Sequence, residues 1–146
     1  MKVLSLFLIT LSLVSYLQAD CSDAESSGSD IYYYAKKGLS TNNLDDAKRY
    51  AKKAMYAAED AERSASDCSC SNSSNTESYA SDAYHYARKA YKASNLSDCH
   101  RYLKKAKSYA EDTESSASDC ANWLVYEDCM FTEGSREFYL TFRVID

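Results

Sequence analysis

Proline is absent from this chain of 146 residues, and glycine occurs only three times. Proline breaks helices and glycine weakens them by about 1 kcal/mol, so their scarcity leaves long stretches free to be helical. Catalytic signatures are also missing: the chain has two histidines, and no Gly-x-Ser-x-Gly, His-Glu-x-x-His or glycine-rich phosphate loop. We therefore expect a helical protein that is not an enzyme and needs no cofactor.

Long apolar runs are missing except at the N-terminus. There, one positive charge at Lys2 is followed by an apolar stretch from Val3 to Leu17 and by the small residue Ala19. This is the layout of a secretory signal peptide, and the stretch is shorter than the roughly 20 apolar residues that span a bilayer. We interpret residues 1–19 as a removed signal peptide. The mature chain is then secreted, either extracellular or in the periplasm or cell envelope, with no stable membrane span.

The chain has no excess of positive charge. It carries 17 basic and 22 acidic residues, a net charge of −5 at pH 7, and loss of Lys2 with the signal peptide would change this to −6. Proteins that hold nucleic acid through its phosphates need basic residues to neutralise them. The composition therefore predicts that nucleic acid is not a partner.

The chain contains an internal repeat. Sliding the sequence by 52 residues superimposes 25–68 on 77–120 without a gap, and 25 of the 44 aligned positions are identical. Two copies of one module, 21–68 and 73–120, therefore make up a domain at 20–120, which a tail at 121–146 follows.

Small and apolar residues recur every three or four positions in each copy, as on the buried face of a helix. In the first copy, the longer of these series is Leu44, Ala47, Ala51, Ala54, Ala58, Ala61 and Ala65. In the second copy, it is Leu96, Cys99, Leu103, Ala106, Ala110, Thr113 and Ala117. The pattern predicts four helices, near residues 23–38, 44–66, 76–93 and 96–118.

Two asparagines mark where the chain turns back. Asn43 and Asn95 each stand before a helix whose third position is acidic, Asp46 or Asp98. The asparagine side chain can accept from an exposed backbone N–H, and the carboxylate meets the positive end of the helix. The short connections force neighbouring helices to lie antiparallel. We predict an all-α fold of two tandem antiparallel helical hairpins.

The composition changes after Cys120. Trp123 to Tyr126 and Phe138 to Ile145 are rich in β-branched and aromatic residues, and Glu133 to Ser135 between them resembles a turn. This pattern is typical of a β-hairpin. We predict one over residues 122–145, in a short β-like tail.

Six cysteines follow the signal segment, an even number in an exported chain, which favours disulfides. In antiparallel hairpins the start of the first helix lies beside the end of the second, which predicts the pairs Cys21–Cys68 and Cys70–Cys120. Each would close a loop of about 50 residues and stabilise the fold by roughly 2 to 4 kcal/mol. Cys99 is either a buried thiol or the partner of Cys129.

The same side chains allow two metal alternatives. Zinc would use Cys68, Cys70, Cys99, His85 and His100, but these lack the paired spacing of structural zinc sites. Calcium would bind weakly to the acidic helix ends, because no loop has the alternating carboxylates of an EF-hand. We expect no bound metal.

An enzyme site formed at the tail, lined by Trp123, His85 or His100, is a more remote alternative.

Charge separates along each predicted hairpin, basic at the turn and acidic at the open end. The basic residues of the two turns are Lys36, Lys37, Lys48, Arg49, Lys52 and Lys53, and Arg88, Lys89, Lys92, Arg101, Lys104 and Lys105. Tyrosines flank the same helices, and each can bury its ring while its hydroxyl stays at water or at a partner. The predicted contact surface is Tyr34, Tyr50, Tyr86, Tyr91, Tyr102, Lys52, Lys53, Lys104 and Lys105. The alternative is a solvated charged surface with tyrosines that only pack one hairpin on the other.

The segment from Ala83 to Ala106 resembles a tetratricopeptide-type helical hairpin. Tyr86 and Ala87 occupy its large and small positions, Asn95 and Leu96 its turn, and Cys99, Leu103 and Ala106 its second helix. The period of 52 is longer than the 34 residues of that family. The resemblance implies a surface that binds a protein or peptide.

These features together predict an exported, non-catalytic interaction or structural module. Its partner would be another protein or an anionic polymer of the envelope or matrix. The alternative function is weak binding of divalent cations or small ligands at the acidic helix ends.

Overall fold

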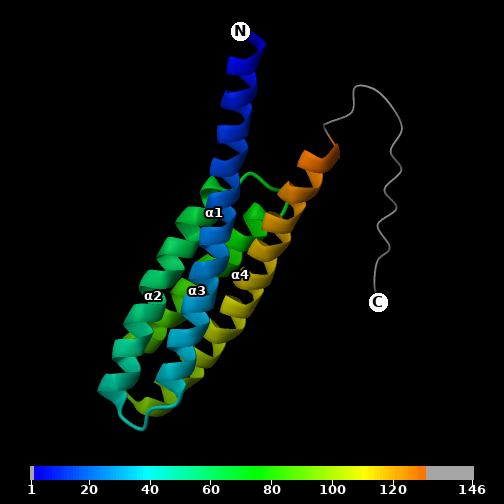
Figure 1. The fold of residues 1–146 in the computed structure, drawn as a ribbon. Helices are drawn as coiled ribbons and strands as arrows, with labels where there is room; N and C mark the ends of the chain where they lie inside the picture. The colour runs from blue at the N-terminus through cyan, green and yellow to red at the C-terminus, as the bar shows by residue number, and fades with distance from the viewer. Residues whose placement is uncertain (1, 131–146) are drawn as a thin grey trace.

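The computed structural model describes the backbone of residues 2–130 and the side chains of residues 21–121. Four helices alternate in direction and form a bundle (Figure 1). They are α1 (Lys2–Leu39), α2 (Leu44–Asp67), α3 (Ser73–Tyr91) and α4 (Leu96–Met130). No strand occurs within residues 2–130. The predicted all-α fold of tandem helical hairpins is confirmed.

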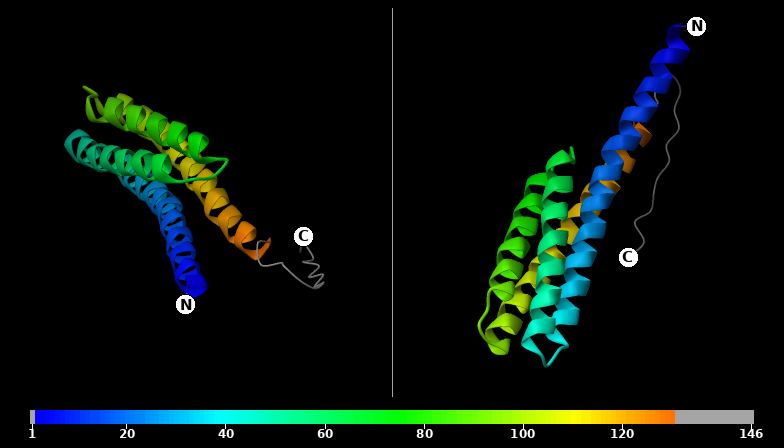
Figure 2. Two further views of the ribbon diagram at one scale, coloured as in Figure 1. Left: turned by 90° about the horizontal axis from the view of Figure 1, so that it is seen from above. Right: turned by 90° about the vertical axis from the view of Figure 1, so that its left-hand side faces the viewer.

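The two hairpins lie side by side. α1 packs on α2 and α4, and α3 packs on the same two helices, whereas the diagonal pairs have much less contact. Both connections within a hairpin, residues 40–43 and 92–95, therefore lie at one end of the bundle, which we call the turn end (Figure 1). The link at 68–72 lies at the opposite end, which we call the base, and α1 and α4 extend beyond it (Figure 2).

Asparagine caps begin both second helices, as predicted. Asn43 Oδ1 accepts from the backbone N–H of Asp45 at 2.8 Å and of Asp46 at 3.4 Å. Asn95 Oδ1 accepts from the N–H of Asp98 at 2.8 Å. Each cap satisfies backbone donors that the first turn of a helix leaves free. The chain reverses direction at these residues, which places α2 against α1 and α4 against α3.

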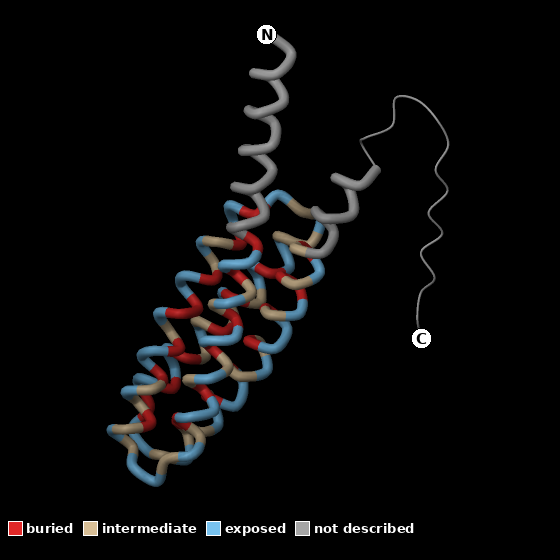
Figure 3. Tube along the Cα trace, in the orientation of Figure 1, coloured by how far each residue is buried: buried red, intermediate tan, exposed pale blue. Residues whose placement is uncertain are grey.

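The core of the bundle consists mostly of alanine. Buried positions follow the inward stripe of each helix (Figure 3), and Ile31 and Leu103 are the largest fully buried side chains among the described residues. Five tyrosines pack at the edge of the central alanine cluster: Tyr32, Tyr34, Tyr84, Tyr86 and Tyr109. Their rings add apolar area that alanine alone would not supply.

Two glycines in α1 allow close packing between helices. A Cβ atom at Gly28 would lie 3.0 Å from the backbone nitrogen of Glu114, and one at Gly38 would lie 2.7 Å from Leu103 Cδ1. Both contacts join α1 to α4, so they help to hold the first hairpin against the second. The glycines are needed here for space rather than for turn geometry.

The chain after Cys120 differs from its prediction. Residues 122–130 continue α4 as helix, so the predicted first strand is wrong there, and the remainder of the expected hairpin lies outside the described residues. This segment has neither glycine nor proline, and adding residues to an existing helix is easier than starting a new element. At the other terminus, α1 already begins at Lys2 and runs through the predicted signal segment, whose removal stays a prediction. Within the described residues, no helix combines the length and apolar composition that crossing a membrane requires.

Candidate interaction surface

Two disulfides join the helices at the base of the bundle. Cys21 bonds to Cys68 with a Cα–Cα distance of 5.2 Å, and Cys70 bonds to Cys120 with a distance of 5.6 Å. Both predicted pairings are therefore confirmed. The two disulfides are neighbours, since the Sγ atoms of Cys68 and Cys70 lie 3.8 Å apart. The base is thus held by covalent bonds within both hairpins.

The five side chains of the zinc alternative do not come together. Cys68 and Cys70 lie in disulfides at the base, whereas Cys99 and His100 lie in the first turns of α4 at the turn end. His85 is exposed on α3. Within the described residues, the only close group of three metal-ligand side chains is Cys68, Cys70 and Cys120, and disulfides already use all three sulfurs.

Cys99 is a buried free thiol. Burial raises its pKa, and the charge of nearby Lys48 lowers it by a smaller amount, so the thiol stays protonated at neutral pH. The alternative pairing with Cys129 does not fit one helix. Both residues lie on α4, and 30 positions at 1.5 Å per residue separate their backbones by roughly 45 Å. The neighbouring His100 is half-buried, and its Nε2 has no hydrogen-bond partner among the described residues.

The turn end carries cations that lack carboxylate partners. The arginines that begin α2 and α4 are paired, Arg49 with Asp46 at 3.0 Å and Arg101 with Asp98 at 2.8 Å. Eight other cations, at equivalent positions in the two copies of the repeat, have no ion pair within 4.0 Å among the described residues: Lys36, Lys37, Lys52, Lys53, Arg88, Lys89, Lys104 and Lys105. No carboxylate among the described residues therefore neutralises their charges.

Some of these cations lie over tyrosine rings, on two flanks of the bundle. In the groove between α1 and α2, Lys53 Nζ lies 5.3 Å from the ring centre of Tyr34. In the groove between α3 and α4, the equivalent Lys105 lies 4.9 Å from the ring centre of Tyr86. Such cation–π contacts at exposed sites contribute about 0.5 to 1 kcal/mol. The repeat thus builds the same lysine–tyrosine pair twice.

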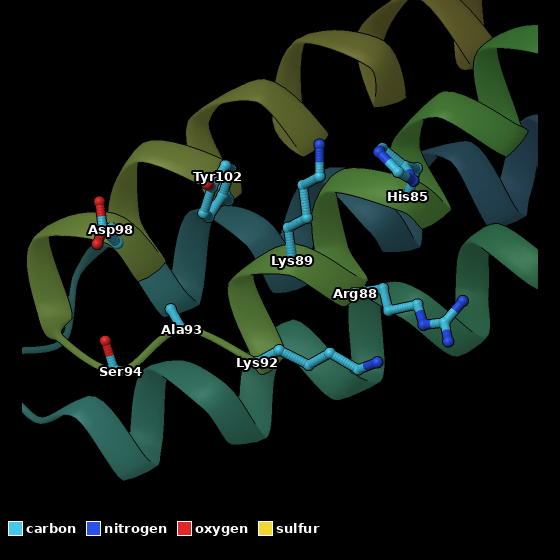
Figure 4. A pocket seen from close by; sticks show the side chains of 8 residues that line it. All are labelled: His85, Arg88, Lys89, Lys92, Ala93, Ser94, Asp98 and Tyr102. Atoms are coloured by element: carbon cyan, nitrogen blue, oxygen red, sulfur yellow. The ribbon is translucent and has the colours of Figure 1, made fainter.

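The second flank has an additional aromatic stack and a shallow hollow. Tyr86 stacks on Tyr109 with ring centres 5.5 Å apart, and Lys89 lies 5.9 Å from the ring centre of Tyr102. A hollow of about 430 Å³ lies beside Lys89 and the ring of Tyr102 (Figure 4). Its lining residues are His85, Arg88, Lys89, Lys92, Ala93, Ser94, Asp98 and Tyr102. In Figure 4, Arg88 and Lys92 extend away from Lys89, so the cations do not converge on one point.

The structure divides the predicted contact residues into two kinds. Tyr34, Tyr86, Lys53 and Lys105 meet in the flank pairs described above, and Tyr102 lies beside Lys89. The others lie outside these pairs: Tyr50 is under Arg49, Lys52 lies over Tyr56, and Lys104 and Tyr91 are exposed.

An exposed row on α2 and α4 was missed by the sequence analysis. We call it the outer stripe. On α2 it consists of Arg49, Lys52, Lys53, Tyr56, Glu59, Asp60 and Arg63, all exposed. On α4 it consists of Arg101, Lys104, Lys105, Ser108, Glu111, Asp112 and Ser115, also exposed. The repeated spacing of three and four was visible in the sequence, but it had been used only to find buried positions.

Exposed residues are retained between the two copies as faithfully as buried ones. Of the 17 aligned pairs that are exposed in both copies, ten are identical, and of the 11 pairs buried in both, five are identical. Five of the ten identical exposed pairs belong to the outer stripe. Burial in the core therefore does not account for which residues the two copies share.

Comparisons with known families, curated proteins and solved structures found no family model, curated protein or solved structure that matches this chain.

Proposed function

We propose that this chain is an exported, non-catalytic interaction or structural module that binds an anionic surface of its partner. The contact surface comprises the turn end and the two lysine–tyrosine flanks. The observation that carries the proposal is the set of eight unpaired cations at equivalent positions in both hairpins. They attract an anionic partner although the whole chain has a net charge of −5.

Helix stability does not account for these cations. Lys52 and Lys53 are the ninth and tenth residues of α2, and Lys104 and Lys105 hold the same places in α4, so all four lie beyond the first turn, to which the effect of the helix dipole is limited. None of the four has a carboxylate three or four positions away in the sequence, so they form no stabilising pairs along their own helix. A role in binding explains a placement that local helix energetics does not favour.

Two further features support an interaction module. Each hairpin resembles a tetratricopeptide-type unit, which implies a binding surface for a protein or peptide. The exposed tyrosines Tyr33, Tyr56 and Tyr91 add aromatic area of the kind enriched at protein interfaces. For the alternative of calcium binding there is no comparable support, because no close carboxylate group occurs within residues 21–121.

Binding to immobilised acidic polymers tests the proposal, with heparin and poly-glutamate as the probes. We expect retention at low salt that falls as salt increases, because surface charges are screened within about 8 Å at physiological ionic strength. The variant Lys52→Gln, Lys53→Gln, Lys104→Gln, Lys105→Gln should lose most of this retention.

The matched control neutralises the acidic residues of the outer stripes, with Glu59→Gln, Asp60→Asn, Glu111→Gln and Asp112→Asn. It should bind the acidic probes at least as well as the wild type. The proposal is wrong if neither probe binds at low salt, or if the two variants bind equally well.

A further inference from the structure

We propose that the partner of this chain is a second copy of itself, held by antiparallel pairing of outer stripes. This inference rests on the proposed function and names the anionic surface: the acidic half of the stripe on another copy.

The charges along each outer stripe are arranged in two halves. On α2 the basic pair Lys52 and Lys53 comes first, and the acidic pair Glu59 and Asp60 follows. Seven residues separate Lys53 from Asp60, which is about 10 Å along a helix. This separation is too long for the lysines to reach the carboxylates of their own helix, and no ion pair joins the two halves. Each half is therefore available to another molecule.

The spacing makes the two lysines and two carboxylates of the stripe complementary to each other when the stripe is reversed, whereas Arg49 of one molecule would meet Arg63 of the other. Tyr56 lies midway between Lys52 and Asp60, and also midway between Lys53 and Glu59. A twofold axis perpendicular to α2 beside Tyr56 would bring Lys52 of one molecule to Glu59 of the other and Lys53 to Asp60, because at about 100° per residue the members of each pair lie on the same side of the helix face. Each interface would then contain four opposite-charge contacts, because every pair occurs twice. Such an interface is isologous, because both molecules contribute the same stripe. Pairing through that stripe therefore stops at two molecules.

The stripe on α4 has the same property. Ser108 lies midway between Lys104 and Asp112, and midway between Lys105 and Glu111. α2 and α4 occupy diagonal corners of the bundle, so their outer stripes face away from each other. One copy can therefore pair with two others, one on each side. The expected assembly is a linear chain of bundles in alternating orientation.

The two stripes should differ in strength because their centres differ. Tyr56 is half-exposed, and its ring would meet the Tyr56 ring of the second molecule at the centre of the α2 interface. Ser108 offers no such apolar contact, and Glu111 is already paired with Lys107 at 2.8 Å. On α2, Glu59 and Asp60 are paired only loosely with Arg63, at 3.9 and 3.4 Å. The contact of Arg49 with Arg63 of the other molecule weakens the α2 interface, whereas Arg101 would face Ser115 in the α4 interface, so measured association decides which interface forms first.

Sedimentation velocity of the full chain tests the inference through charge reversal. One variant carries Lys52→Glu, Lys53→Glu, Lys104→Glu and Lys105→Glu, and the other carries Glu59→Lys, Asp60→Lys, Glu111→Lys and Asp112→Lys. The wild type should associate at low salt, with Kd increasing about tenfold or more when salt screens the pairs. Each variant alone should be monomeric, and an equimolar mixture should associate again. Helical circular dichroism confirms that each variant is folded.

Cross-linking tests the register of the pair. In a Cys129→Ser background, Ser108→Cys and Tyr56→Cys each place a thiol on the proposed twofold axis, so each should cross-link to its own copy through a short bismaleimide. Ser66→Cys is the control for Tyr56→Cys. Ser66 is exposed on α2 about 15 Å from the axis, so the two Ser66 positions in a paired dimer would be about 30 Å apart. Cross-linking of Ser66→Cys at a rate equal to the other two would overturn the antiparallel register.

The inference is overturned if the wild type stays monomeric at low salt, or if an equimolar mixture of the two charge-reversed variants stays monomeric. These results leave the proposed function intact when the wild type still binds the acidic probes and the lysine variants do not. If both self-association and probe binding fail, the inference and the proposed function fail together.

Discussion

The two hairpins differ mainly in the core and at the turns, and they agree along their charged outer stripes. Position 38 is glycine in the first hairpin and its counterpart is Ala90, whereas position 51 is alanine and its counterpart is Leu103. These differences are coupled, because Leu103 occupies the space that a Cβ at Gly38 would need. The core has diverged so that the hairpins fit each other, while the outer stripes have kept five of their seven residues, including every lysine and carboxylate. The proposed function attributes this retained surface to binding.

The largest effect should come from breaking the base of either hairpin. Replacing Cys21 and Cys68 by serine, or Cys70 and Cys120, should each lower the free energy of unfolding by about 4 kcal/mol, since each bridge closes a loop of similar length. Denaturant unfolding measures both losses. Losses of under about 1 kcal/mol would show that the disulfides contribute little to stability. A large difference between the two variants would show that the base does not hold the two hairpins in the same way.

Removing the large side chain from the interface between the hairpins should have a somewhat smaller effect. Leu103→Ala leaves a cavity over Gly38 and should cost about 3 kcal/mol, measured by denaturant unfolding. The double variant Gly38→Ala, Leu103→Ala tests the coupling, because the new methyl group would enter the vacated space and recover part of the loss. If Gly38→Ala is as harmful in the Leu103→Ala background as in the wild type, then the two positions are not coupled.

The caps should contribute least, and they should be similar in the two hairpins. Asn43→Ala and Asn95→Ala each remove an acceptor from free backbone N–H groups and should lower the free energy of unfolding by about 1 kcal/mol. Asn42→Ala, at an exposed position in the connection before α2, is the control and should have little effect. Thermal unfolding compares the three variants. A cap loss no greater than that of the control would contradict the assigned role of the asparagines.

Features that depend on short spacing could be predicted from the sequence. The caps at Asn43 and Asn95 follow from their position before an acidic helix start, and both disulfides follow from antiparallel geometry. The side-by-side packing of the hairpins could not be predicted in the same way, since it depends on contacts such as Gly28 with Glu114, which lie far apart in the chain. The strand predicted after Cys120 was wrong because composition indicated β structure where continuation of α4 prevailed.

The candidate surface was predicted only in part, for a related reason. The sequence identifies Lys52, Lys53, Lys104 and Lys105 from their charge, but it places the acidic residues only at the open end of each hairpin. Their place on the same exposed stripe as the lysines emerges once burial is known, because burial separates the outward positions of α2 from the inward ones.

The central claim is that the retained charges act between molecules and not within the fold. The most direct test measures stability and self-association on one variant, Lys52→Gln, Lys53→Gln, Lys104→Gln, Lys105→Gln. Its free energy of unfolding should fall by no more than about 2 kcal/mol, because the cation–π contacts of Lys53 and Lys105 are lost, while its association at low salt should be abolished. A loss of several kcal/mol in stability together with unchanged association would contradict the claim.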